Sequence, residues 1–111
     1  MGAHRLLTLA GAAVIAVSSI ALARAQTDES QGESLAREVC AECHAVEPGS
    51  MQSPNPDASA FQVLADTPGM NALTIRVWLQ TPHRDMPLLV LDDAEIESVS
   101  AYIMSLEHLS P

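Results

Sequence analysis

The sequence contains no lysine, and its five arginines stand against 14 aspartates and glutamates in 111 residues. Arg5 and Arg24 precede every acidic residue, so residues 26–111 carry three arginines, all 14 acids and a formal charge of −11. Nucleic acids and anionic membrane surfaces bind proteins through clustered lysine and arginine side chains. The shortage of basic residues therefore argues against both kinds of partner and favours a protein partner with a basic docking face.

Aromatic residues are also scarce, with one Phe, one Trp and one Tyr in the chain. At this length we expect one small domain, and the sequence shows no internal repeat. The hydrophobic core of so small a domain contributes only ~3–5 kcal/mol of net stability. A cross-link, a metal or a cofactor is therefore expected to complete the core of residues 26–111.

The longest uncharged run lies near the N-terminus. It follows Arg5, extends from Leu6 to Ala23, and ends in Ala23-Arg24-Ala25, the small-x-small pattern that signal peptidase recognises. Residues 1–25 are therefore predicted to be a secretory signal peptide cleaved after Ala25, which would export the domain to the periplasm. The alternative is an uncleaved membrane anchor through residues 6–23, since a helix of ~17–25 apolar residues spans a bilayer.

Hydrophobic spacing and prolines divide the next part of the chain into short elements. Residues 26–32 are polar and predict a frayed lead-in, whereas Ser34–His44 has apolar residues at helical spacing and predicts a short helix. Residues 47–59 contain three prolines and predict an irregular loop. One or two helical turns are expected at Ala60–Ala65.

Two further helices have boundary signals of their own. Asn71 is a suitable N-cap and Pro82 cannot continue a helix, and the apolar face between them is predicted to contain Leu73, Ile75, Val77, Trp78 and Leu79. After a loop at residues 81–91, Asp92 and Glu95 form a capping-box pattern, and the last helix repeats Ile96, Val99, Ile103 and Leu106 on one face. Because no alternating strand pattern exceeds four residues, the predicted fold class is all-α, with three to four short helices.

The chemistry of the chain is concentrated in the run C-A-E-C-H at residues 40–44. Positions i, i+3 and i+4 of a helix share one face, so Cys40, Cys43 and His44 are expected to point in similar directions. Two thiols and an imidazole complement a haem, whose two vinyl groups accept thiols as thioethers and whose iron binds neutral imidazole. The C-x-x-C-H spacing therefore predicts covalent attachment of one c-type haem.

Three other interpretations of the cysteines are less well supported. A redox-active C-x-x-C of the thioredoxin kind follows a strand in a βαβ pattern, and no such pattern surrounds Cys40. A disulfide between Cys40 and Cys43 would close too short a loop to add much stability. A zinc site would need a fourth ligand, usually from a second closely spaced pair, and neither is evident.

Beyond this motif, the sequence resembles the small class I bacterial cytochromes c through essentially all of residues 26–111. The similarity rests on four features: Gly32 eight residues before Cys40, the C-A-E-C-H run, the pattern Pro82-x-x-x-Met86-Pro87, and Val99-x-x-Tyr102-Ile103. The family implies a small cytochrome c fold of three to four short helices around the haem. It also implies that His44 is the proximal iron ligand and Met86 the distal one.

The place of Met86 in the chain supports the same assignment. Met86 lies in a loop far from His44 in sequence, and Pro82 and Pro87 restrict the backbone near it. His83, three residues earlier, is the alternative distal ligand, because imidazole also binds haem iron. A bis-histidine site would have a lower redox potential than a His/Met site.

The resemblance implies further roles around the haem. Phe61, Trp78 and Leu79 would line the haem pocket, and Gly32 would let the first helix cross close to the last. In the family, the proximal histidine donates a hydrogen bond to the carbonyl of a proline two residues before an aromatic residue. This chain has Ser59 at that position, which leaves open the residue that orients His44.

These features together predict an exported one-electron carrier, rather than an enzyme, that exchanges electrons with redox protein partners. Met86, a soft thioether ligand, would favour the reduced iron and raise the redox potential. The alternative is a haem enzyme subunit, or a protein that binds peroxide or a small gas, in which Met86 is displaced from the iron.

Overall fold

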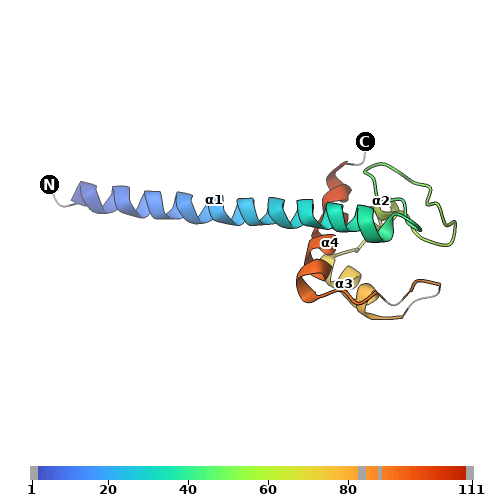
Figure 1. The fold of residues 1–111 in the computed structure, drawn as a ribbon. Helices are drawn as coiled ribbons and strands as arrows, with labels where there is room; N and C mark the ends of the chain where they lie inside the picture. The colour runs from blue at the N-terminus through green and yellow to red at the C-terminus, as the bar shows by residue number, and fades with distance from the viewer. Residues whose placement is uncertain (1–2, 83–84, 88, 110–111) are drawn as a thin grey trace.

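We describe a computed structural model of the chain, with the backbone of residues 3–82, 85–87 and 89–109 and the side chains of 17–82, 85–87 and 89–107. These residues form helices and loops, with no strand among them. The elements in chain order are α1 (Ala3–Leu35), a π-helical turn (Ala36–Cys40), α2 (Phe61–Ala65), α3 (Ala72–Gln80), α4 (Asp93–Ser105) and a 3₁₀-helix (Leu106–Leu109) (Figure 1). The predicted all-α fold class is confirmed.

The crossing of α1 and α4 organises the domain (Figure 1). Gly32 of α1 is buried at this crossing. A Cβ atom at Gly32 would lie 1.9 Å from the carbonyl oxygen of Ser98 and 2.8 Å from the Cβ of Tyr102. Only glycine permits so close an approach of the two backbones, which confirms the predicted crossing.

The last helix, α4, supplies much of the core, as its apolar spacing predicted. The Glu95 amide donates to the Asp92 carboxylate and the Asp92 amide donates to the Glu95 carboxylate, both at 2.8 Å, which completes the capping box. The core cluster joins residues of the π-helical turn, of α2, α3 and α4, and of the C-terminal 3₁₀-helix. They include Ala36, Phe61, Ile75, Val99, Tyr102, Ile103 and Leu106. The fold therefore converges on one face of α4.

Two predicted boundaries near the start of the domain are wrong. Residues 26–32 are not a frayed lead-in but part of α1, because the end of α1 is held against α4 where Gly32 is buried. Tertiary packing thus outweighs the polar composition of this segment. The helix predicted at Ser34–His44 is the last turn of α1 followed by the π-helical turn, and residues 41–43 form turns.

The middle elements agree with their boundary signals. Residues 47–59 form an irregular loop, and α2 lies within the predicted Ala60–Ala65. The Asn71 side chain caps α3 by accepting a hydrogen bond from the Thr74 amide at 3.0 Å. Helix α3 ends at Gln80, two residues before Pro82. The described residues of 81–91 contain no helix, as expected.

The predicted apolar face of α3 is largely exposed, which corrects that part of the sequence interpretation. Ile75 is buried and Leu79 is half-buried, whereas Leu73, Val77 and Trp78 expose 70%, 51% and 58% of their surfaces. Ile75 and Leu79 are four residues apart and therefore form a single narrow stripe along α3. Helix α3 packs against the core along this stripe, so the rest of its circumference faces outward.

The N-terminal part of α1 projects away from the other helices (Figure 1), and the molecule extends 69 Å along its longest axis. The predicted leader, residues 1–25, and the alternative anchor through 6–23 fall largely on residues whose side chains lie outside the described set. Among the described residues we find no helix whose length and hydropathy together would allow it to span a bilayer. Cleavage after Ala25 stays a prediction.

Candidate functional site

The C-A-E-C-H run begins in a π-helical turn rather than in a regular α-helix. The Ala41 amide donates to the carbonyl of Ala36, five residues earlier, at 3.0 Å. The Cys43 and His44 amides both donate to the carbonyl of Cys40, at 3.2 and 2.9 Å. The expected α-helical arrangement of the three side chains is therefore corrected to a π-helical turn followed by a tight turn, a geometry often found at functional sites.

The two cysteines are free and differ in burial. Cys40 is 9% exposed, and burial raises the pKa of its thiol from 9.0 to about 11. The Cys40 thiol therefore remains protonated at neutral pH. Cys43, in contrast to buried Cys40, is half-buried. The absence of a bond between them, and of any strand among the described residues, gives no support to the disulfide and thioredoxin-like alternatives.

The imidazole of His44 is held by the backbone of Ser59. Its Nδ1 lies 2.6 Å from the Ser59 carbonyl oxygen, which can only accept, so Nδ1 carries a proton. This leaves Nε2 as the lone-pair nitrogen of the neutral ring, the arrangement typical of metal-binding histidines. The sequence left open which residue orients His44, because Ser59 stands where the family has a proline. In the structure, the main-chain carbonyl of Ser59 orients His44.

Hydrogen bonds on both sides of His44 fix the loop that contains it. The Asn55 amide donates to the Cys43 carbonyl at 3.1 Å, and the Phe61 amide donates to the Ala45 carbonyl at 2.9 Å. The Tyr102 hydroxyl of α4 donates to the Val46 carbonyl at 2.7 Å. The loop is therefore attached both to the start of α2 and to the α1–α4 crossing.

Gln62 is a buried polar residue that the sequence analysis missed. Its Oε1 accepts from the Gly49 amide at 2.8 Å, and its Nε2 donates to the Leu106 carbonyl at 3.0 Å and to the Asp66 carboxylate at 3.1 and 3.2 Å. With 2% of its surface exposed, Gln62 links the His44 loop, α2 and the end of α4. A single polar residue in a short helix carries no sequence signal for such a role.

Of the predicted pocket residues, the structure places Phe61 beside His44. The two rings have centroids 5.5 Å apart at an interplanar angle of 48°, and the Phe61 ring also lies 6.5 Å from that of Tyr102. Leu79 packs against the core cluster that contains Cys40 and Phe61. Trp78, on the same helix as Leu79, is largely exposed.

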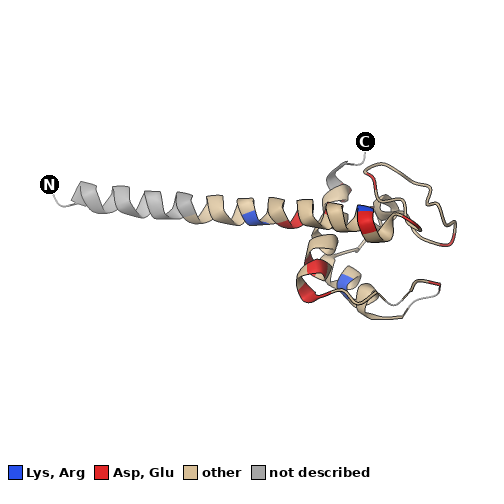
Figure 2. Ribbon diagram, viewed as in Figure 1, with Lys and Arg blue, Asp and Glu red and all other residues tan. Residues whose placement is uncertain are grey.

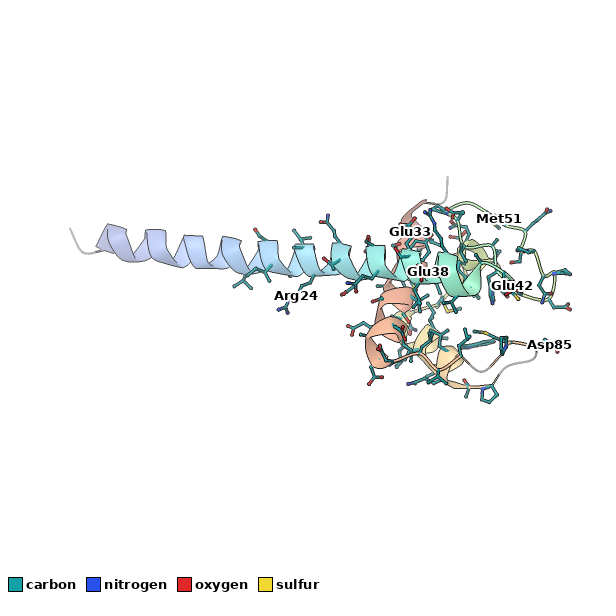
Figure 3. The ribbon with its side chains drawn as sticks, in the orientation of Figure 1. Arg24, Glu33, Glu38, Glu42, Met51 and Asp85 are labelled. Carbon is teal, nitrogen blue, oxygen red and sulfur yellow. The ribbon has the colours of Figure 1, made fainter. Side chains whose placement is uncertain are left out.

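Met86 lies in the loop that follows α3, half-buried between the exposed residues Asp85 and Pro87. Asp85, next to Met86, and Glu42, inside the C-A-E-C-H run, both lie at the end of the domain far from the N-terminus of α1 (Figure 3). None of the hydrogen bonds, ring contacts or core contacts of the described residues joins Met86 to Cys40 or His44. The alternative distal ligand, His83, lies outside the described residues.

The donor set fits a covalently attached haem. Two free thiols stand three residues apart, the neighbouring imidazole has its Nδ1 proton engaged, and a partly buried thioether lies on a separate loop. Apolar side chains of α3 that a bound hydrophobic group could cover are exposed in the polypeptide alone. Among the described residues, no three His, Cys, Asp or Glu side chains form a metal cluster, so the zinc alternative gains no support.

Acidic residues outnumber basic ones along the described chain (Figure 2). Arg37 pairs with Glu33 and Glu47, each at 2.8 Å, and the hydrogen bond to Glu47 raises the pKa of Arg37 above its usual value. Burial, and then Glu33 and Glu47, raise the pKa of the nearby Tyr102 hydroxyl. Arg76 pairs with Asp93 at 3.1 Å. The basic side chains of Arg37 and Arg76 are therefore engaged by acids within the chain.

No protein-family model matches the chain, and no curated protein and no solved structure with detectable similarity was found.

Proposed function

We propose that this chain is a mono-haem c-type cytochrome that carries one electron at a time between protein partners. The observation that supports this most directly is the 2.6 Å contact between His44 Nδ1 and the Ser59 carbonyl, beside two free cysteines in C-x-x-C-H spacing. These residues are groups that attach a haem and ligate its iron, so the function that we propose is electron transfer.

Each functional side chain has a distinct task in this proposal. The thiols of Cys40 and Cys43 would hold the haem covalently, each joined to a vinyl group as a thioether. His44 would offer Nε2 to the iron, while the Ser59 carbonyl holds the ring in the required tautomer. Met86 would offer its sulfur as a second iron ligand, and a thioether ligand favours the reduced state. When bound, haem supplies an iron that alternates between the ferric and ferrous states and so stores one electron.

The proposed setting is the periplasm, after removal of residues 1–25, with a basic redox protein as partner. This follows from the leader pattern and from the −11 formal charge of residues 26–111. Opposite charges accelerate association, and salt screens them over about 8–10 Å at physiological ionic strength. The association rate with a basic redox partner should therefore fall as salt rises, and a rate that is independent of salt would contradict acidic docking.

The decisive experiment is an absorption spectrum of the protein produced together with a haem-attachment system. We expect haem that remains bound after denaturation, and a sulfur-to-iron charge-transfer band in the oxidised protein. The Met86→Ala variant should keep the covalent haem and lose this band, whereas Met51→Ala, at an exposed loop methionine, should keep both. Protein without covalent haem would refute the proposal.

A second candidate function is supported by the sparse bonding around Met86. The described loop residues 85–87 and 89–91 make no hydrogen bond, so displacement of Met86 would break none. A haem enzyme subunit or a gas- or peroxide-binding protein needs such an open iron position. Rapid binding of cyanide or carbon monoxide at neutral pH would favour this function, and resistance to both would favour the electron carrier.

A further inference from the structure

Asp85 has an unusual backbone conformation immediately before Met86. Its φ is +62°, and among the residues that the structure describes it is the only non-glycine residue with a positive φ. A Cβ atom makes this left-handed region unfavourable; Asp and Asn tolerate it best, and β-branched residues tolerate it least. Such outliers persist where the surrounding structure or the function requires them. The conformation of Asp85 therefore calls for a reason at this position.

Met86 follows this left-handed residue and is itself restricted. Asp85 and Pro87 are exposed, whereas Met86 between them is half-buried. The ring of Pro87 disfavours the α region for Met86. Two consecutive residues with restricted backbone conformations therefore accompany the half-burial of Met86.

Little besides packing holds the described part of this loop. No hydrogen bond to another element and no ion pair joins residues 85–87 or 89–91 to the rest of the described chain. Val90 exposes 94% of its surface, whereas Leu89 and Leu91 are half-buried. The torsion angles of the residues beside Met86 therefore contribute to the direction of its side chain.

We propose that Asp85 is a positioning residue for Met86, whose left-handed backbone directs the thioether toward the iron. The inference rests on the proposed function, in which Met86 is the distal ligand. It assigns the role to the backbone conformation and not to the carboxylate. Asparagine and glycine should therefore replace Asp85, whereas a β-branched residue should not.

The test measures the equilibrium affinity of the oxidised, haem-loaded protein for free imidazole, which must displace Met86 in order to bind. Asp85→Asn and Asp85→Val form a matched pair, because both remove the charge and they differ in tolerance of the left-handed region. We expect Asp85→Asn and Asp85→Gly to stay within about twofold of the unmodified protein. Asp85→Val should bind imidazole about tenfold more tightly, which corresponds to about 1.4 kcal/mol.

Each outcome decides for or against the inference. Equal affinities of the Asn and Val variants, whether raised or unchanged, would overturn it, because the charge or nothing at all would then be responsible. If Asp85→Val does not mature, Asp85→Ala compared with Asp85→Asn provides the same contrast with a smaller difference. The intensity of the sulfur-to-iron band is a second readout, expected to be weakened by Val and preserved by Asn.

The Met86→Ala variant separates this inference from the proposed function. Tighter imidazole binding by Met86→Ala, together with equal affinities of the Asp85 variants, would reject only the role of Asp85. Unchanged imidazole binding by Met86→Ala would show that Met86 is not the ligand. The proposed ligation and the inference would then both fail.

Discussion

The residues around His44 and those around Met86 are held in different ways. In the His44 region, residues 40–66, hydrogen bonds of 2.6–2.8 Å join His44 to Ser59 and Gly49 to Gln62 within the region, and Val46 to Tyr102 of α4. In the Met86 region, residues 72–91, the described loop residues make none, and α3 is attached through a narrow apolar stripe and the exposed Arg76–Asp93 ion pair.

In the proposed function, this difference means that the two iron ligands are prepared in two ways. The Ser59 carbonyl orients His44, and the buried side chains of Tyr102 and Gln62 hold the neighbouring Val46 and Gly49. Met86 is directed by backbone torsion angles in a loop with little other support. In the proposed function, the bond from Met86 to iron would hold the Met86 region in place. The hydrogen bonds do this for the His44 region.

The largest expected effect is at the helix crossing beneath the His44 region. Gly32→Ala places a Cβ 1.9 Å from the carbonyl oxygen of Ser98. Because this oxygen belongs to the backbone of α4, relieving the clash requires the two helices to move apart. We expect a loss of at least about 3 kcal/mol in the free energy of unfolding, measured with urea. Gly69→Ala, just before α3, meets no atom within 4 Å but has a φ of +82°, so it should cost about 1 kcal/mol. Similar losses of unfolding free energy in the two variants would contradict the close approach of α1 and α4 at Gly32.

Gln62 offers the most direct comparison of the two regions. Gln62→Leu leaves the Gly49 amide and the Leu106 carbonyl without their partner, at an expected cost of about 2–3 kcal/mol in urea unfolding. Gln80→Leu, on the exposed end of α3, should change stability by less than about 0.5 kcal/mol. If the two variants are equally stable, the buried hydrogen bonds of Gln62 do not make the His44 region more stable than the Met86 region.

Cys40 tests whether the His44 region is folded before haem attachment. Its thiol pKa is raised from 9.0 to about 11, so the folded, haem-free chain keeps a proton that the unfolded chain releases. Stability is therefore complete below pH 9 and is lost as the pH rises toward 11, by about 2 kcal/mol. Cys40→Ala should remove this part of the decline and leave the part due to Tyr102, whose pKa is also raised.

Thiol labelling provides the complementary measurement. In a haem-free Cys43→Ser variant at pH 8, a thiolate-specific reagent should modify Cys40 about 100-fold more slowly than in urea, because the reactive form is the thiolate. Equal rates with and without urea would mean that the haem-free His44 region is not assembled. The contrast between the two regions would then arise only after haem attachment.

The smallest effect is expected in the Met86 region. Arg76→Gln removes the ion pair to Asp93, both of whose side chains are substantially exposed. Exposed pairs of this kind contribute roughly 0–1 kcal/mol, so the change in urea unfolding should be below about 0.5 kcal/mol. A loss above about 2 kcal/mol, the size expected for Gln62→Leu, would show that α3 is held more firmly than its contacts indicate.

Local signals in the sequence were sufficient for α3 and α4. Asn71 and Pro82 mark the limits of α3, and the Asp92–Glu95 capping box marks the start of α4, because caps and prolines act within a few residues. The helical state of residues 26–32 was not predictable in this way. It depends on contact with Ser98, more than 60 positions later in the chain.

The candidate site divides along the same line. Cys40, Cys43 and His44 were predicted from the sequence because haem attachment requires those residue types at that spacing, and their binding of haem stays a prediction. The Ser59 carbonyl could not be assigned from residue type, since every residue has a carbonyl and only the folded chain brings this one to His44. The exposure of Trp78 was missed because apolar character was equated with burial in the polypeptide alone.

The π-helical turn at Ala36–Cys40 lies between two constrained points, the Gly32 crossing and the C-A-E-C-H run. A bond from the Ala41 amide to the carbonyl five residues earlier encloses one residue more than an α-helical turn does. Each residue of a helix adds roughly 100° of rotation about its axis. Deleting one residue between Gly32 and Cys40 would therefore turn both thiols by about a quarter of a revolution relative to α4, with the motif itself intact. The number of residues between Gly32 and Cys40 therefore determines the direction in which the two thiols face relative to α4. We expect this number to tolerate less change than the identity of the exposed side chains between them.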